Sequence, residues 1–253
     1  MIDDARKYAA TQLSTPTTAF LALSGEPLPQ MEEALPIGEL VRKAAISHAD
    51  TGSPDASVPS VLSGHGLSEG NRHGHAFYLA GDSTGNGRID HVIVHAADGL
   101  AGAPLQALHR IRRLWQKGRE WKVELSWAGT AAELRGSYAG PSRTWISVTP
   151  YSHPWFAKRR FPAREQIRRE CRARCLPVPE AVQLATVRCG TRECRADDYV
   201  LLRGKRNQTQ PDQRGSFWRL DFPSPITGPL ALGFACHYGL GLFQAARSDP
   251  TPP

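Results

Sequence analysis

The order of the predicted elements places this chain in the α+β class. Residues 14–129 read as strand, helix, two strands, helix, strand, and residues 142–246 begin the same order again more weakly. That order is typical of the ferredoxin-like fold, an antiparallel sheet of four strands with two helices on one face. A glycine-rich stretch near the C-terminus adds a third observation, because its strand would close the second sheet. The sequence therefore predicts tandem ferredoxin-like (RRM-like) domains at 14–129 and 142–246, with a C-terminal glycine-rich loop.

The first domain opens with an apolar run and an amphipathic segment. Thr17–Ser24 (TTAFLALS) predicts a strand. Pro36–His48 predicts a helix, because its apolar residues recur at helical spacing and proline is favoured in the first turn. Residues 49–60 have the composition of a loop.

A hairpin and a second helix complete this domain. His75–Ala80 and Asp90–Ala96 predict two strands joined by a glycine-rich turn. Apolar residues from Leu105 to Trp115 recur at helical spacing after Pro104, which predicts a helix. Lys122–Trp127 (KVELSW) predicts the last strand.

The second domain repeats this order with one element missing. Its predicted elements are the strand Thr144–Tyr151, the helix Ala163–Cys175, and the strands Ala181–Arg188, Ser216–Phe222 and Leu230–Ala235. No helical pattern is found between residues 222 and 229. The polar, basic segment 195–215 predicts a flexible insertion.

Composition restricts the class of partner. Lys and Arg number 31 against 24 acidic residues, a net charge of +7, which favours an anionic partner and nucleic acid before membrane. No apolar run approaches the length of a membrane span and no signal peptide opens the chain. Five cysteines, none in a CxxC pair, indicate reduced thiols in a cytoplasmic protein and leave zinc as a minor alternative.

The stretch 228–243 carries glycines where a side chain would block a close approach. Gly233, Gly239 and Gly241 follow the strand predicted from Leu230. Such glycines let another backbone come close or permit a positive φ. Bare N–H groups at this loop would suit a polyanion. A tight turn between packed elements is the alternative.

Four strings resemble one CRISPR-associated family in order and spacing. They are HGHAFYL at 73–79, DSTGNGRIDHV at 82–92, SRTWISVTP at 142–150 and GPLALGFACHYGLGLF at 228–243. They resemble the RNA-processing half of the Cas-five/Cas-six fusion protein of type I-U (I-G) systems. A Cas-five-like module precedes this region in that family, so we expect the present chain to be a separate processing domain. The resemblance implies a cytoplasmic endoribonuclease that binds and cuts a CRISPR repeat stem-loop and works with other effector subunits.

The implied chemistry is RNA scission that needs no metal or cofactor. The 2′-hydroxyl attacks the adjacent phosphate, which leaves a 2′,3′-cyclic phosphate, and histidine suits both proton transfers. His73 and His75 would project from the same face of a strand, beside Arg72. His48, at the end of the first helix, is the rival, with helix capping as its alternative role. His237 lies in the glycine-rich loop, where it would contact RNA or stabilise the turn.

The loop between the hairpin strands resembles a calcium site only in part. Asp82, Asn86 and Gly87 match the first, fifth and sixth places of an EF-hand loop, but Ile93 stands at the twelfth, where Glu is wanted. A polar turn pinned by Asp82 and Asp90 is the better prediction.

RNA recognition is expected from basic groups. Lys158, Arg159 and Arg160 follow Trp155 and Phe156, so phosphate contacts and base stacking would be neighbours. The complete predicted RNA-binding set is Arg72, Arg143, Lys158, Arg159, Arg160, Arg164, Arg168, Arg169, Arg172, Gly233, His237, Gly239 and Gly241. A further basic pair is Lys205 and Arg206.

Three functions stay open at this level. The first is an endoribonuclease that uses His73, His75 or His48. The second is a non-catalytic RNA-binding subunit of a guide complex, and the third is a metal-dependent hydrolase that uses Asp82 and Asp90.

Overall fold

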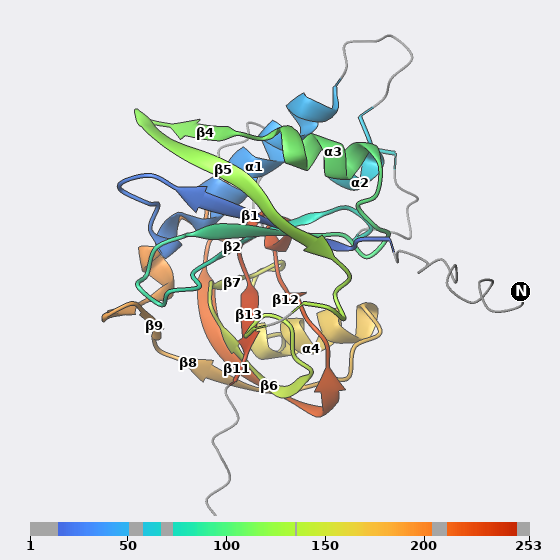
Figure 1. Cartoon of the computed structure of the whole chain (residues 1–253). Coiled ribbons are helices and arrows are strands. Elements are labelled where there is room, and N and C mark those ends of the chain that lie inside the picture. Colours follow the sequence, from blue (N-terminus) through green and yellow to red (C-terminus); the bar gives the residue numbers. More distant parts are fainter. Residues whose placement is uncertain (1–14, 51–57, 67–72, 135, 204–211, 247–253) are drawn as a thin grey trace, which may run out of the picture.

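Two antiparallel sheets make up the body of the protein (Figure 1). The computed structural model describes residues 15–50, 58–66, 73–134, 136–203 and 212–246. Arg72 and the pair Lys205 and Arg206 lie outside these residues. Among the described helices, none combines the length and the apolar character that a bilayer crossing requires.

The first sheet has the strand order of a ferredoxin-like fold. Its strands run in the order β2-β3-β1-β5-β4, and β5-β1-β3-β2 is the ferredoxin-like part. The fifth strand, β4, extends the sheet as a hairpin with β5. The bounds are β1 Thr18–Ser24, β2 Phe77–Gly81, β3 His91–His95, β4 Arg113–Gln116 and β5 Arg119–Gly129.

Helices cover one face of this sheet. They are η1 Met31–Glu33, α1 Ala34–Ala49, α2 Ser60–Ser63 and α3 Ala103–Arg110. The helix α1 buries Ile37, Val41 and Ala45, one apolar stripe at helical spacing. The second predicted helix is shorter than expected, because the chain turns into β4 after Ile111. Trp115 therefore lies on a strand and is 66% exposed.

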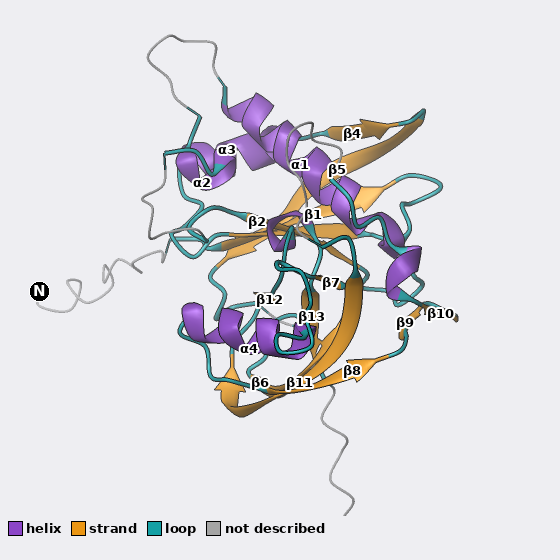
Figure 2. Cartoon of the chain, turned by 180° about the vertical axis from the view of Figure 1, so that it is seen from behind, coloured by secondary structure: helices purple, strands orange, loops and turns teal. Residues whose placement is uncertain are grey.

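The second sheet has the same strand order but only one helix. Its order is β12-β13-β6-β11, and both β7 and β8 pair with β11. Figure 2 shows this sheet curling around α4. The bounds are β6 Ser142–Ser147, β7 Tyr151–Ser152, α4 Ala163–Ala173, β8 Glu180–Leu184, β11 Gly215–Ile226, β12 Leu230–Ala231 and β13 Leu242–Ala245. Tandem ferredoxin-like folds are thus confirmed, with the second helix of the second unit replaced.

A glycine-rich loop takes the place of that helix. Between β11 and β13 the chain forms the two-residue strand β12 and the short helix η3 (Cys236–Tyr238). The predicted strand Leu230–Ala235 is wrong beyond Ala231, since Gly233 has a φ of 97° and Ala235 a φ of 59°. The strand that pairs with β6 follows the loop and is β13.

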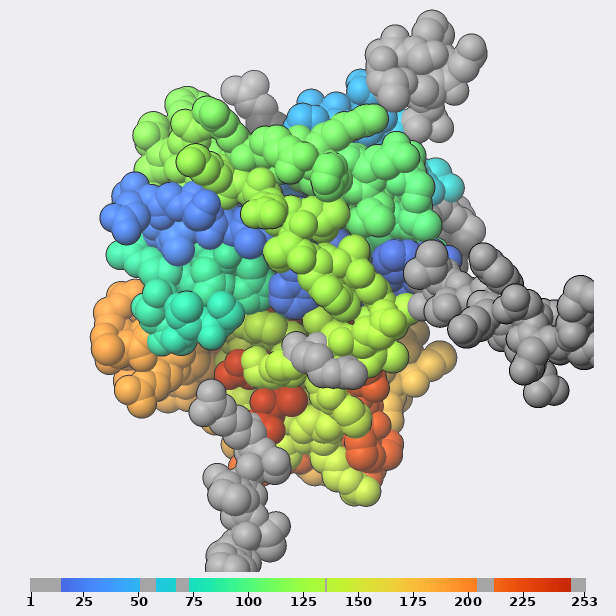
Figure 3. Space-filling model, in the orientation of Figure 1, coloured from blue at the N-terminus to red at the C-terminus, as the bar shows by residue number. Residues whose placement is uncertain are grey.

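The insertion after β8 is packed where the structure describes it. The hairpin of β9 (Val187–Cys189) and β10 (Arg192–Cys194) leads into η2 (Ala196–Asp198). Tyr199 and Leu201 are buried in the core of the first sheet, so the prediction of flexibility is wrong for 195–203. In Figure 3 this orange segment lies directly against the teal loop of residues 82–90, where Gly87 approaches the backbone of Cys189.

The first sheet is buried on both faces at its centre. One face contributes Leu21, Tyr78 and Val92 to the core shared with α1. The other face packs Leu79 and Ile93 against the strands and loop of the second unit. One apolar cluster therefore joins the two units, and Cys236 of η3 belongs to it.

Candidate functional site

Three histidines meet where the two units join. His73 and His75 precede β2, and His237 lies in η3 of the glycine-rich loop. The Nδ1 of His73 is 3.1 Å from the Nε2 of His237. The ring centroids of His75 and His237 are 3.6 Å apart, with planes 22° apart. The sequence predicted all three as site residues, and the structure brings them together.

The ring of His237 is fixed on both faces and both edges. His75 stacks on it at 3.6 Å and Phe77 at 3.9 Å. The His237 Nδ1 lies 3.3 Å from the carbonyl oxygen of Ala76. The rings of His73 and His237 differ by 7° in plane, with centroids 5.3 Å apart. The two ring centroids are much farther apart than the two nitrogens, so both nitrogens lie between the ring centres. The hydrogen bond therefore runs close to the plane of both rings.

The hydrogen-bond partners decide where the protons are. A carbonyl only accepts, so the Nδ1 of His237 carries a proton and donates it to Ala76. Burial lowers the pKa of His237 to about 2, so the ring is neutral and its Nε2 is bare. His73 must then donate from Nδ1 to that Nε2. The tautomer of His73 that makes this bond has Nε2 as its basic nitrogen, and a basic ring nitrogen is what a general base requires. We call the two consecutive hydrogen bonds, from His73 to His237 and from His237 to the Ala76 carbonyl, the histidine relay.

His75 supports this arrangement by packing. It is half-buried, and burial together with the charge of Arg42 lowers its pKa. Its Nδ1 has no hydrogen-bond partner among the described residues. A neutral ring stacked face to face on His237 keeps positive charge away from the relay.

A buried ionic network on α4 anchors the glycine-rich loop. Glu170 of α4 accepts from the N–H of Gly233 at 2.9 and 3.0 Å and from Arg174 at 2.6 Å. Arg174 also donates to the carbonyl of Ala231 at 2.7 Å and to the Sγ of Cys236 at 3.3 Å. Burial raises the pKa of Glu170, and the Arg174 charge opposes that effect. The sequence pattern assigned these two residues no role.

The donor atoms of His73, Cys236 and His237 lie within 4.8 Å of one another. Imidazole and thiolate would suit zinc or another transition metal. The relay bond uses the same two nitrogens and points them at each other, and burial raises the pKa of Cys236 to about 11. The ring geometry thus favours the hydrogen bond over a shared metal.

The loop glycines pack against the protein's own backbone. A Cβ on Gly241 would lie 1.7 Å from the carbonyl oxygen of Leu232, and one on Gly239 would lie 2.8 Å from that of Ala34. The N–H groups of Gly233 and Gly241 are bonded to Glu170 and to Pro150. These contacts match the tight-turn alternative, and a role of Gly233, Gly239 and Gly241 in RNA binding stays a prediction.

His48 is not brought into this cluster. It is exposed at the end of α1, where its carbonyl accepts from Arg110 at 3.3 Å. Among the described residues, neither a hydrogen bond nor a ring contact joins His48 to the relay.

The predicted basic residues lie on the second unit. Arg164, Arg169 and Arg172 are exposed on α4, and Arg168 is 3.5 Å from Glu165. Arg143 is exposed on β6, where its guanidinium donates to the carbonyl of Pro223 at 2.7 Å. Lys158, Arg159 and Arg160 are exposed before α4.

A pocket opens beside that last run. Lys158 and Arg159 line it together with His153 and Ser216, which the sequence analysis did not single out. The Nε2 of His153 is 2.9 Å from the Oγ of Ser216, and its Nδ1 is 3.5 Å from the Oδ2 of Asp212. This resembles a catalytic triad, but the Oγ also accepts from the indole of Trp218 at 2.7 Å and Asp212 is held by Arg214. We assign the cluster a structural role.

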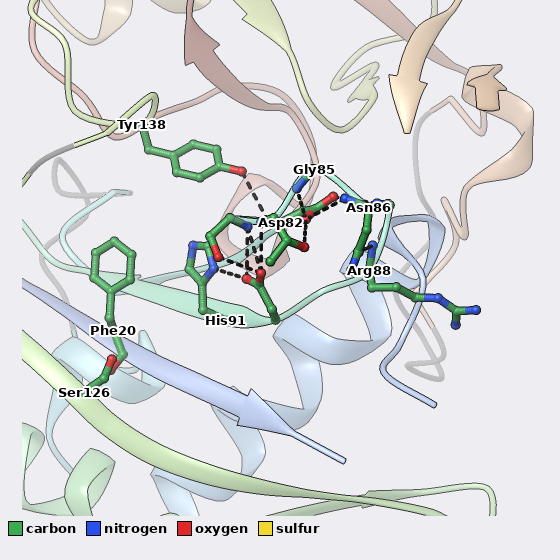
Figure 4. A network of polar contacts seen from close by, with 12 residues as sticks. Phe20, Asp82, Gly85, Asn86, Arg88, His91, Ser126 and Tyr138 are labelled. Atoms are coloured by element: carbon green, nitrogen blue, oxygen red, sulfur yellow. Dashed lines mark hydrogen bonds and ion pairs between the residues drawn. The ribbon is translucent and has the colours of Figure 1, made fainter. Parts of the chain in front are cut away.

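The loop between β2 and β3 is a polar turn held by two aspartates, as predicted (Figure 4). Asp82 accepts from the N–H groups of Gly85 at 2.7 Å and Gly87 at 2.6 Å. Asp90 accepts from the hydroxyl of Ser83 and lies 2.5 Å from the Nδ1 of His91. These bonds account for the order of the loop, so the calcium alternative gains no separate support.

Comparison with known proteins finds similarity among solved structures but none at the level of sequence. No protein-family profile matches the sequence, and no curated protein does. A solved chain titled "CRISPR associated protein Cas6" aligns with 92% of this chain and 99% of its own length, at a TM-score of 0.45 and 7% sequence identity. An identity and a TM-score this low support no statement about the activity of the present protein.

Proposed function

We propose that this protein is an endoribonuclease that cleaves CRISPR repeat RNA without a metal ion. The observation that carries the proposal is the histidine relay, because the bond to His237 assigns the proton of His73 to Nδ1 and makes Nε2 the basic nitrogen of that ring. His73 is exposed, while His237 is buried. A substrate can therefore reach His73. His237 contributes only by fixing the proton of His73 on Nδ1. The four strings that resemble the CRISPR-associated family supply the substrate class.

The reaction follows from this placement. The Nε2 of His73 takes the proton of a 2′-hydroxyl, and the oxygen attacks the adjacent phosphorus. The bond to the 5′-oxygen breaks, and that oxygen takes a proton from solvent while His73 returns its proton to solvent. The products are a 2′,3′-cyclic phosphate and a 5′-hydroxyl. His75 packs on the relay, and the exposed arginines of α4 would contact the RNA backbone. The mature guide would pass to other effector subunits.

Incubation of the protein with CRISPR repeat stem-loop RNA in excess chelator tests this proposal. We expect His73→Ala to lower the single-turnover rate by about 10²- to 10⁴-fold, the range of a lost general base. His237→Ala should lower the same rate less, with RNA affinity unchanged. His48→Ala is the matched control and should cut at the wild-type rate.

Other outcomes would select the alternatives. Binding of repeat RNA without any cleavage would support a non-catalytic RNA-binding subunit. Activity that disappears with chelator would support a metal-dependent hydrolase, and a wild-type rate in His73→Ala would remove the relay from the mechanism.

A further inference from the structure

A pocket of about 490 Å³ opens at the start of α4, away from the histidine relay. Its lining includes Lys158 and Arg159 on one side and the buried side chains of His153 and Ser216. The relay is connected to the other end of α4 through Arg174, which contacts Cys236 next to His237. The helix rises 1.5 Å per residue, so these two ends are roughly 17 Å apart.

The charges at this pocket favour an anion. Lys158 and Arg159 are exposed at its edge, and Arg214 lines it while bonded to Asp212 at 2.7 Å. Asp197 is an acid in the lining, so the two unpaired cations still leave a positive balance. A phosphate is the anion that such a group of cations most often binds in a nucleic-acid-binding protein.

The end of α4 adds backbone donors to these cations. Pro162 and Ala163 line the pocket, and α4 begins at Ala163 with no side-chain cap. The first N–H groups of a helix lack partners within it and carry partial positive charge. His153 is 7% exposed in this lining, where its Nε2 is 2.9 Å from the Oγ of Ser216 and its Nδ1 is 3.5 Å from Asp212. The protein itself holds that ring, so the groups left for an anion are the two cations and the first N–H groups of α4.

Two aromatic residues come just before Ala157, a residue of the pocket lining. Phe156 is 63% exposed, and the guanidinium of Arg214 lies 5.5 Å from its ring centroid. Trp155 is 36% exposed, with Arg169 at 4.9 Å. Exposed rings beside cations are the pattern of a platform on which an unpaired base stacks.

We propose that this pocket binds one unpaired nucleotide of an RNA. Its phosphate would lie between Lys158, Arg159 and the first N–H groups of α4, and its base would stack on Phe156. The identification of the ligand as RNA rests on the proposed function. Because the length of α4, roughly 17 Å, lies between the pocket and the helix end that contacts the glycine-rich loop, the nucleotide held here would lie further along the strand from the cut.

Binding of short single-stranded RNAs of mixed sequence, each with 2-aminopurine at one position, tests the pocket. The protein carries His73→Ala throughout, so that binding is measured without cleavage. We expect 2-aminopurine fluorescence to be quenched at one position, and Phe156→Ala to abolish that quenching. Lys158→Ala with Arg159→Ala should weaken binding about 10- to 100-fold and reduce the slope of log affinity against log salt by about 2.

Controls separate this proposal from the proposed function. Arg112→Ala with Arg113→Ala removes two exposed cations of the first unit and should leave the quenching unchanged. Inorganic phosphate and nucleoside monophosphates are used as competitors. Displacement by both alike would mean a phosphate site only and would overturn the nucleotide site.

The cleavage assay gives the remaining outcomes. Loss of quenching in the pocket variants, with no cleavage by wild-type protein, would keep the pocket and overturn the endoribonuclease. Wild-type affinity, quenching and cleavage in the pocket variants would overturn the pocket and keep the endoribonuclease.

Discussion

The two ferredoxin-like units differ in one connection. In the first unit, β3 and β5 are joined through α3, which packs beside α1 over the sheet. In the second unit, β11 and β13 are joined through β12, η3 and the glycine-rich loop. The first connection covers its own sheet. The second leaves its sheet and brings His237 against His73 and His75 of the other unit.

This difference shows how a repeated fold gains a site. A helix between β11 and β13 would bury its apolar stripe on its own sheet. A loop that has glycine at its contact points, such as Gly239, can instead approach α1 closely. A Cβ on Gly38 of α1 would lie 2.4 Å from the carbonyl oxygen of Tyr238. The close fit of loop and helix positions the ring of His237, so packing and proposed chemistry depend on the same contacts.

Substitution of Gly241, the most crowded glycine of the loop, should have the largest effect on the stability of the protein. In Gly241→Ala the new Cβ would lie 1.7 Å from the carbonyl oxygen of Leu232, at a φ of 63°. We expect a loss of more than about 4 kcal/mol in the free energy of unfolding, since neither backbone can move freely. Urea denaturation followed by tryptophan fluorescence measures it.

A glycine of the first unit gives the matched control. Gly118 has a φ of 79°, but nothing lies within 4 Å of its added Cβ. Gly118→Ala should therefore cost only about 1 kcal/mol, the usual price of the left-handed region. Equal denaturation midpoints for the two variants would show that the loop is not tightly packed.

The buried anchor of the loop should have the next largest effect. Glu170→Ala leaves Arg174 without its carboxylate and frees the N–H of Gly233. Breaking a buried pair on one side costs about 3 kcal/mol or more. The exposed pair of Arg113 and Glu120, 2.9 Å apart in the first unit, is the control. Glu120→Ala should cost less than about 1 kcal/mol, and a similar loss in both variants would argue against the anchor.

Acid should destabilise both units through neutral histidines. Burial lowers the pKa of His95 in the first unit to about 4 and that of His237 in the loop to about 2. In the unfolded chain both titrate near 6.5, so below that pH the unfolded state binds more protons and the free energy of unfolding falls. Each histidine contributes at most about 1.4 kcal/mol per pH unit, down to its folded pKa.

A substitution assigns that pH dependence. His95 bonds the hydroxyl of Thr18 at 2.9 Å, and His95→Asn removes the titrating ring. The plot of unfolding free energy against pH from 7 to 5 should become shallower by up to about 1 kcal/mol per pH unit. An unchanged slope would mean that His95 is already protonated in the folded protein.

Local patterns predicted the elements better than the connections. The apolar runs before Ser24 and after Asp90 identified β1 and β3, and the amphipathic segment from Ala163 identified α4. Trp115 was assigned to a helix because helical spacing does not reveal where the chain turns back. The predicted strand from Leu230 ended early because Gly233 and Ala235 both have a positive φ.

The residues of the site could be predicted from the sequence, but the positions of the protons on their rings could not. Histidines at 73, 75 and 237 belong to resembling strings, so they were candidates from the start. Which nitrogen carries a proton depends on the carbonyl of Ala76 and on burial by Phe77, and neither is visible in a sequence pattern. His153 and Glu170 were missed because each gains its meaning from a partner far along the chain.

The relay also sets when during synthesis the site can exist. His73 and His237 are 164 positions apart, so the first leaves the ribosome long before the second. A nascent chain that has folded only its first unit holds His73 without the ring that fixes its tautomer. Competence for RNA scission would therefore arise only after His237 has left the ribosome and the glycine-rich loop has folded against the first unit.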